Sequence, residues 1–113
     1  MRESKPKFVQ RAFAFTGAGY DSPAPLASHT VSDGRRAQMV YLRAGNSSPG
    51  MVVVSVSKDG APMRFFPIGA KGAVHVPLAV VEDIDPGTTL DLAIAAPAGV
   101  SGTVVIDFGL VEI

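Results

Sequence analysis

The side chains most able to do chemistry in this sequence are its two histidines, His29 and His75. A zinc site needs several ligands at fixed distances, and carboxylates would have to join these two because the chain has no cysteine. Ser28, His29 and Asp33 lie close together, but no nucleophile elbow or oxyanion-type glycine motif surrounds them. We therefore expect ordinary surface or interface histidines, no metal, no cofactor and no enzymatic activity. His75 alternates with two valines, which predicts an outward side chain.

Three acids and two short motifs raise other possibilities. Glu82, Asp83 and Asp85 could suggest calcium, but the EF-hand pattern is absent, so a solvated rim is the preferred interpretation. Gly17-Ala18-Gly19 is too short for a nucleotide-binding fingerprint. Asn46-Ser47-Ser48 matches a glycosylation acceptor, and here it indicates only a surface loop.

Basic residues are concentrated early in the chain. Residues 1–43 carry seven Lys or Arg against three acids, and residues 44–113 carry three against seven, while the net charge is zero. Arg35, Arg36 and Arg43 could touch phosphate, but nucleic-acid-binding domains are usually basic overall, so we expect no nucleic acid. The two parts could attract each other, within one chain or between neighbouring copies. Solvated surface charge without a partner is an equally good interpretation.

Composition favours strands and turns over helices. Hydrophobic residues make up 47% and charged residues 18%, with 12 glycines and 9 prolines among 113 residues. No apolar run approaches the length of a membrane helix, and the polar N-terminus has no signal-peptide core. We expect cytoplasmic synthesis without a signal peptide and no membrane partner. A small domain this apolar is expected to turn part of its apolar surface toward a partner or another copy of itself.

Short alternating runs separated by turn residues predict an all-β chain, a small antiparallel β-sandwich or jelly roll. Residues 1–7 are expected to form a flexible, extended N-terminal arm, and residues 8–113 a single sandwich domain. The stretch 85–113 is expected to form a hairpin that supplies an apolar wall. Residues 17–28 are expected to form a surface loop or an extended reach along a neighbour, and 80–84 a strand or a helical turn. The strands are predicted at 7–16, 29–31, 37–44, 51–57, 61–68, 73–78, 90–94 and 103–113.

Aromatic residues point to a candidate interface. Met63-Arg64-Phe65-Phe66 stands beside two prolines, and aromatic residues and arginine are favoured at interface centres. The prolines also predict that this strand lies at a sheet edge. An ordinary edge strand with buried phenylalanines explains the same residues equally well. The complete set of candidate interface residues is Phe8, Phe13, Phe15, Tyr20, Met63, Arg64, Phe65 and Phe66.

The residues from Pro86 to Ile94 and from Ala96 to Val105 give the chain a family resemblance. Together with the Ala/Gly/Val-rich, cysteine-free composition, this tail resembles small tailed-phage virion proteins of the capsid decoration or cement type. The resemblance implies a sandwich that trimerises or docks on a capsid lattice, with its arm reaching a neighbouring subunit. It also implies a virion-associated location.

A second resemblance is to the sensory rhodopsin transducer family, small cytoplasmic β-sandwich oligomers. The segments 41–46, 52–62 and 71–76 follow a comparable order of strand, hairpin and histidine-containing strand. The leading hypothesis is a non-catalytic assembly protein that self-associates, a trimer being favoured, and docks on a larger particle such as a phage capsid. The alternatives are a small ligand- or carbohydrate-binding module and a transducer-type oligomer.

Overall fold

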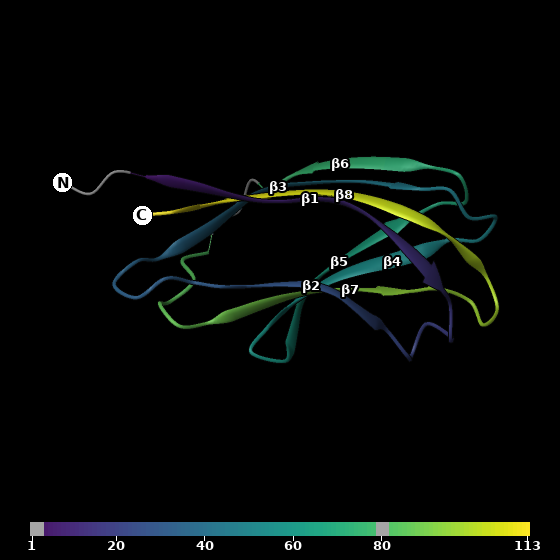
Figure 1. The fold of residues 1–113 in the computed structure, drawn as a ribbon, viewed down its shortest axis with the longest axis horizontal. Coiled ribbons are helices and arrows are strands. Elements are labelled where there is room, and N and C mark those ends of the chain that lie inside the picture. The colour runs from purple at the N-terminus through teal and green to yellow at the C-terminus, as the bar shows by residue number, and fades with distance from the viewer. Residues whose placement is uncertain (1–3, 79–81) are drawn as a thin grey trace.

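The computed structural model describes residues 4–78 and 82–113, and these residues form strands, turns and loops without any helix. The prediction of an all-β chain is confirmed. No helix that could cross a membrane occurs in the described part of the chain. Figure 1 shows the elements, which are β1 (Lys5–Thr16), β2 (Ala24–Thr30), β3 (Ala37–Asn46), β4 (Val52–Lys58), β5 (Ala61–Ile68), β6 (Ala73–Pro77), β7 (Thr89–Ala95) and β8 (Ser101–Glu112).

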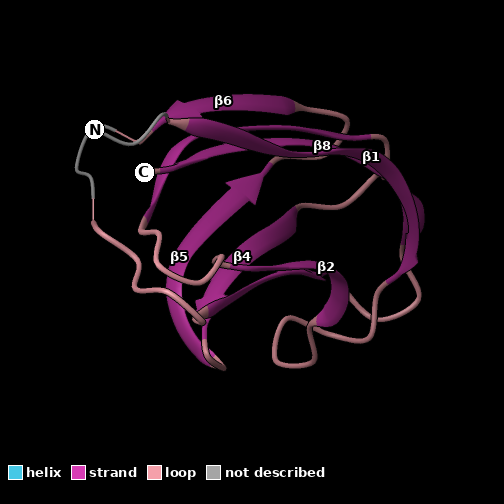
Figure 2. Cartoon of the chain, turned by 60° about the vertical axis from the view of Figure 1, so that its left-hand side comes forward, coloured by secondary structure: helices cyan, strands magenta, loops and turns pink. Residues whose placement is uncertain are grey.

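The strands form two four-stranded sheets packed face to face. One sheet has the order β1-β8-β3-β6 and the other the order β2-β7-β4-β5, and all pairings are antiparallel. We call them the β8 sheet and the β7 sheet. These orders, with successive strands alternating between sheets in most of the chain, are those of a jelly roll. Figure 2 shows the two layers, with β6, β8 and β1 on one side and β5, β4 and β2 on the other.

The core lies between the sheets and follows the alternation of each strand. On β4, Val52, Val54 and Val56 are fully buried. On β8 every second residue faces the core and is at most 2% exposed: Val104, Ile106, Phe108 and Leu110. Burying each such side chain contributes about 1.5–3 kcal/mol relative to leaving it in water. In both strands one side of the alternation therefore forms the core and the other side faces outward.

A tight turn joins β4 to β5. Asp59 and Gly60 both have positive φ, 48° and 85°, which is the backbone of a type I′ hairpin turn. β5 is an edge strand of the β7 sheet, as its prolines predicted. Pro62 and Pro67 have no backbone N–H, so the free edge of β5 offers fewer hydrogen-bond donors to another strand.

The predicted C-terminal hairpin is wrong. β7 belongs to the β7 sheet and pairs with β2 and β4, whereas β8 belongs to the β8 sheet and pairs with β1 and β3. The turn between them carries the chain from one sheet to the other. Both strands still contribute apolar rows to the core, because alternation fixes a strand's inner face but not its hydrogen-bonding partners.

Two boundaries also differ from expectation. Strand β2 takes in residues 24–28 of the predicted loop 17–28 and overlaps the predicted strand 29–31. Pro25 is tolerated because β2 is an edge strand with a register shift beside it. Lys5–Lys7 of the predicted arm pair with Glu112–Leu110, so β1 begins before Phe8. Of the segment 80–84, residues 80 and 81 lie outside the described residues, and Ile84 forms an isolated bridge with Ala37.

Gly17 should tolerate no side chain. Its backbone passes the β7–β8 connection so closely that a Cβ would lie 2.2 Å from the carbonyl oxygen of Pro97. We expect Gly17→Ala to lower the free energy of unfolding by about 2 kcal/mol, because backbone on both sides must move. Gly45→Ala is the matched control, since its Cβ would meet no heavy atom within 4 Å. Urea unfolding of both variants measures the difference, and equal midpoints would contradict the packing described here.

Candidate functional site

Three of the eight predicted interface residues lie in the core instead. Phe13 and Phe15 on β1 are each 9% exposed, and Phe66 on β5 is 5% exposed. Their side chains point between the sheets, since Phe13 pairs with buried Val104 and Phe66 with buried Val54. The strand alternation that makes these rings core residues removes them from any surface.

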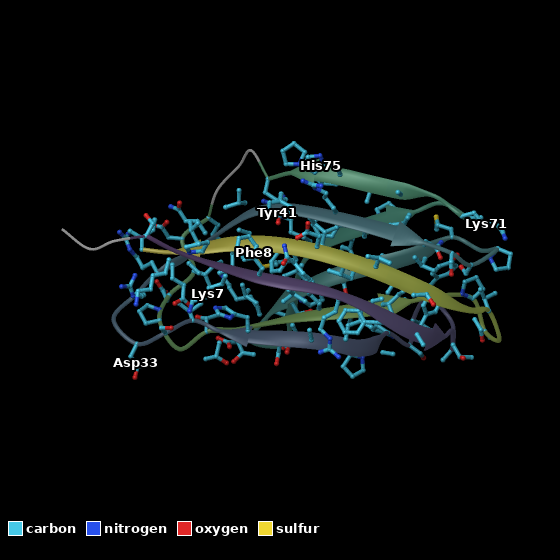
Figure 3. All side chains as sticks on the ribbon, turned by 45° about the horizontal axis from the view of Figure 1, so that its top comes forward. Lys7, Phe8, Asp33, Tyr41, Lys71 and His75 are labelled. Carbon is cyan, nitrogen blue, oxygen red and sulfur yellow. The ribbon has the colours of Figure 1, made fainter. Side chains whose placement is uncertain are left out.

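The other five residues are distributed over different parts of the sandwich. Phe8 is 55% exposed on the outer side of the β8 sheet, where Figure 3 labels it, and Phe65 is 64% exposed on the outer side of the β7 sheet. Tyr20 donates its hydroxyl hydrogen to the Met51 carbonyl oxygen at 2.8 Å, which ties its loop to the start of β4. Met63 packs against the core, and Arg64 is half-buried. The structure therefore does not gather the predicted residues into one patch.

Phe65 projects from a nearly uncharged sheet face. Its register partner Ser55 lies opposite Ala93, which pairs with Pro25 of the far edge strand. The neighbouring row is Ala95, Val53 and Pro67. We give the name Phe65 face to the following part of this outer side: Pro25, Val53, Ser55, Ser57, Phe65, Pro67, Asp91, Ala93 and Ala95, of which Ser55 and Ala95 are themselves buried.

Asp91 is the single charged residue of the Phe65 face. The rest are small or apolar, so the face is flat except where the Phe65 ring stands out. Depletion of charge around an exposed aromatic ring is typical of the centre of a protein–protein interface. The prolines of β5 hinder sheet extension at that edge.

A buried carboxylate is the second unusual feature. Glu112 continues the inward row of β8 and is fully buried at the open end of the sandwich. Its Oε2 lies 2.8 Å from Nε2 of His29 on β2 and accepts a hydrogen bond from the Ser32 backbone N–H at 3.1 Å. The pair therefore joins the two sheets. The expectation that His29 is an ordinary surface histidine is corrected, whereas His75 is exposed as predicted.

The Glu112 site has a definite charge but no catalytic geometry. Burial raises the pKa of Glu112, but hydrogen bonds from the Ser32 hydroxyl and backbone and from His29 outweigh it, so the pKa is below its ordinary value. In a catalytic triad the histidine lies between nucleophile and acid. Here the acid lies between Ser32 and His29, and Asp33 is not the partner of the histidine. We assign this cluster a structural role.

The other motifs also have structural roles. Asn46 is buried, donates to the carbonyl oxygens of Gly50 and Gly69, and accepts from the Ser48 N–H. It is therefore not the exposed loop side chain that its motif suggested. Arg36 and Asp83 form an ion pair at 2.8 Å, which joins the basic and acidic parts of the sequence within one chain.

No three His, Cys, Asp or Glu side chains gather into a metal-binding group among the described residues. Two acids of the predicted cluster form side-chain ion pairs instead: Glu82 with Lys58 at 3.3 Å, and Asp83 with Arg36. A solvated rim remains the interpretation of this cluster.

Comparison with known proteins identifies the fold and no family. No family model matches the sequence, and no curated protein is similar to it. Over 96% of the chain and 94% of the other protein, the structure is similar to that of PirA, with a TM-score of 0.52 and 8% identity. It is also similar to a chain of infectious bursal disease virus, Gx strain, with a TM-score of 0.54 and 13% identity over 98% of this chain.

The insecticidal delta-endotoxin Cry8Ea1 from Bacillus thuringiensis is a third match, with a TM-score of 0.52 and 11% identity over 90% of this chain. The present chain spans about a third of the viral chain and a fifth of the endotoxin, 32% and 19%. At these identities the matches show a shared β-sandwich architecture and nothing about activity.

Sequence reasoning missed Glu112, although a signal was present. The apolar row Val104, Ile106, Phe108 and Leu110 predicts that the next residue in register also points inward. A carboxylate at that position requires a buried partner. A search for such a partner among the two histidines would have favoured His29, since the sequence itself predicts His75 to be exposed.

Proposed function

We propose that this protein is a non-catalytic assembly module whose copies associate through the Phe65 face. The carrying observation is the composition of that face, an exposed phenylalanine on a flat surface that bears Asp91 as its single charge. With so little charge to complement, the face suits a surface like itself better than a strongly charged partner. In a closed three-fold ring, the Phe65 ring of each copy would pack on Pro25 and Ala93 of the next copy, so that different parts of the same face meet.

The assembly is proposed to dock on a larger particle such as a phage capsid. The jelly-roll architecture that this chain shares with a protein of infectious bursal disease virus supports the proposal, as does the resemblance of the tail to phage decoration proteins. A trimer is the preferred stoichiometry within this proposal. The outer side of the β8 sheet is left available for other contacts.

Phe65→Asp tests the proposed interface. The new carboxylate would be buried against the Phe65 face of another copy, and we expect the dissociation constant to rise at least about a hundredfold. Light scattering on a size-exclusion column measures the mass of each variant. Val40→Asp is the matched control, because Val40 is 46% exposed on the other sheet. If Phe65→Asp keeps the mass of the unmodified protein, or if Val40→Asp lowers it equally, the Phe65 face is not the interface.

A further inference from the structure

The outer side of the β8 sheet carries a shallow hollow that the assembly proposal does not use. Its volume is about 530 Å³, within the range of small-molecule sites, and Arg43, Gly45, Ala73, His75, Val105 and Asp107 line it. These residues come from the three strands β3, β6 and β8. The hollow lies on the opposite side of the sandwich from the Phe65 face.

Two cross-strand rows explain the shape of the hollow. In one row Val105, Gly45 and Ala73 are register partners, and their small side chains form a shelf. In the next row Gln10, Asp107, Arg43 and His75 stand side by side across all four strands and form a polar wall. A flat sheet thus gains a concave step where small residues adjoin long ones.

Tyr41 fixes the position of the acid in the polar wall. Its ring lies over Gly109, whose Cβ would be only 2.3 Å from the Tyr41 Cε1 atom. The Tyr41 hydroxyl donates to Oδ1 of Asp107 at 2.7 Å, and Gln10 donates to the same oxygen at 3.1 Å. Neither hydrogen bond occupies Oδ2, which keeps an acceptor available at the hollow.

Asp107 is held as a carboxylate. The hydrogen bond from the Tyr41 hydroxyl lowers the pKa of Asp107; burial opposes it, and Gln10, Arg43 and His75 add to the lowering. The acceptor is therefore present throughout the neutral pH range.

Arg43 and His75 supply donors beside this acceptor. The Arg43 guanidinium lies 5.7 Å from the centre of the Tyr41 ring, and the His75 ring meets Tyr41 edge to face at 6.3 Å. Figure 3 shows Tyr41 and His75 on this side of the sandwich. In residues 4–78 and 82–113 neither Arg43 nor His75 forms a direct ion pair, so the Arg43 charge acts on Asp107 from a distance and leaves the Arg43 donors available.

We propose that the hollow binds a hydroxyl-rich ring, a pyranose unit of a glycan. Sugar hydroxyls both donate and accept, so one can donate to Asp107 while others accept from Arg43 and His75. The apolar C–H side of the ring would rest on Val105 and the Gly45–Ala73 shelf. Asp107 disfavours a simple anion, and Arg43 disfavours a simple cation. This inference is independent of the proposed self-association, because it uses the opposite sheet.

Amide NMR titration of the full chain with galactose, glucose, mannose and N-acetylglucosamine tests the proposal. We expect at least one sugar to shift amide signals of residues 43–45, 73–75 and 105–107 in a saturable way. Asp107→Asn should lower the affinity for that sugar about tenfold or more, because the substitution removes a charged acceptor. Gly45→Ala should also weaken it, since the added methyl occupies the shelf while meeting no protein atom within 4 Å.

Two controls make the outcome decisive. The Phe65→Asp variant should bind the sugar as the unmodified protein does, because Phe65 lies on the opposite sheet. The sugar proposal can therefore be tested even if the assembly proposal fails. Sodium phosphate should cause no comparable shifts at these amides. The inference is overturned if no sugar shifts these signals, if phosphate alone shifts them, or if Asp107→Asn and Gly45→Ala leave the affinity unchanged.

Discussion

Replacing His29 by alanine should lower the free energy of unfolding by about 3 kcal/mol, because the buried Glu112 carboxylate loses one of its hydrogen-bond partners. The Glu112 carboxylate is fully buried and would keep its hydrogen bonds from Ser32. The expected loss is no larger because the His29 side chain is 22% exposed, so water can partly replace it. Urea unfolding at one fixed protein concentration measures the change.

The same pair predicts how stability responds to acid. The pKa of Glu112 is lowered in the folded protein, so its contribution is complete above its unfolded pKa, near 4.5. That contribution is lost as the pH falls through the lower, folded value. Glu112→Gln should unfold with a flatter pH dependence below about 4.5. An acid limb identical to that of the unmodified protein would show that Glu112 does not link the sheets as a carboxylate.

Asn46→Ala should cost about 2–3 kcal/mol of folding stability, because several buried backbone groups lose their partners at once. The side-chain amide donates to Gly50 at 2.9 Å and to Gly69 at 3.1 Å, and its oxygen accepts from Ser48 at 2.9 Å. It therefore holds the β3–β4 loop against the end of β5. The measurement is the urea midpoint, again at fixed protein concentration.

Thr16→Ala is the control for Asn46→Ala. Thr16 also takes part in a side-chain hydrogen bond, to Ser101 at 2.9 Å, but that bond is exposed. Water can replace it, so we expect a change within about 0.5 kcal/mol. Equal losses in the two variants would mean that burial of Asn46 adds nothing to the stability of the loop.

Much of the fold was predictable because apolar alternation reports burial directly. The rows Val52–Val56 and Val104–Leu110, the Asp59-Gly60 turn and the proline-bearing edge strand β5 all follow from local sequence. The partners of β7 and β8 did not, since alternation identifies an inner face and leaves the neighbouring strand open. Only the end of β2 was predicted, within the strand 29–31; its first part was missed because Pro23 and Pro25 favour a loop, although an edge strand tolerates proline.

The candidate sites were harder to predict, because local sequence does not show which strands become neighbours. The aromatic residues on β1 and β5 were recognised, but which rings face the core depends on each strand's phase and pairing. The polar wall is a clearer case, because residues 10, 43, 75 and 107 are far apart in sequence. Only the strand order β1-β8-β3-β6 brings them side by side.

Self-association is the central claim, and sedimentation equilibrium of the unmodified chain over a wide range of concentrations tests it most directly. The Phe65 face predicts a molecular mass that is a whole multiple of the chain mass at micromolar concentration, with three copies preferred. The mass should fall toward a single copy on dilution. A single-copy mass at every concentration would contradict the claim.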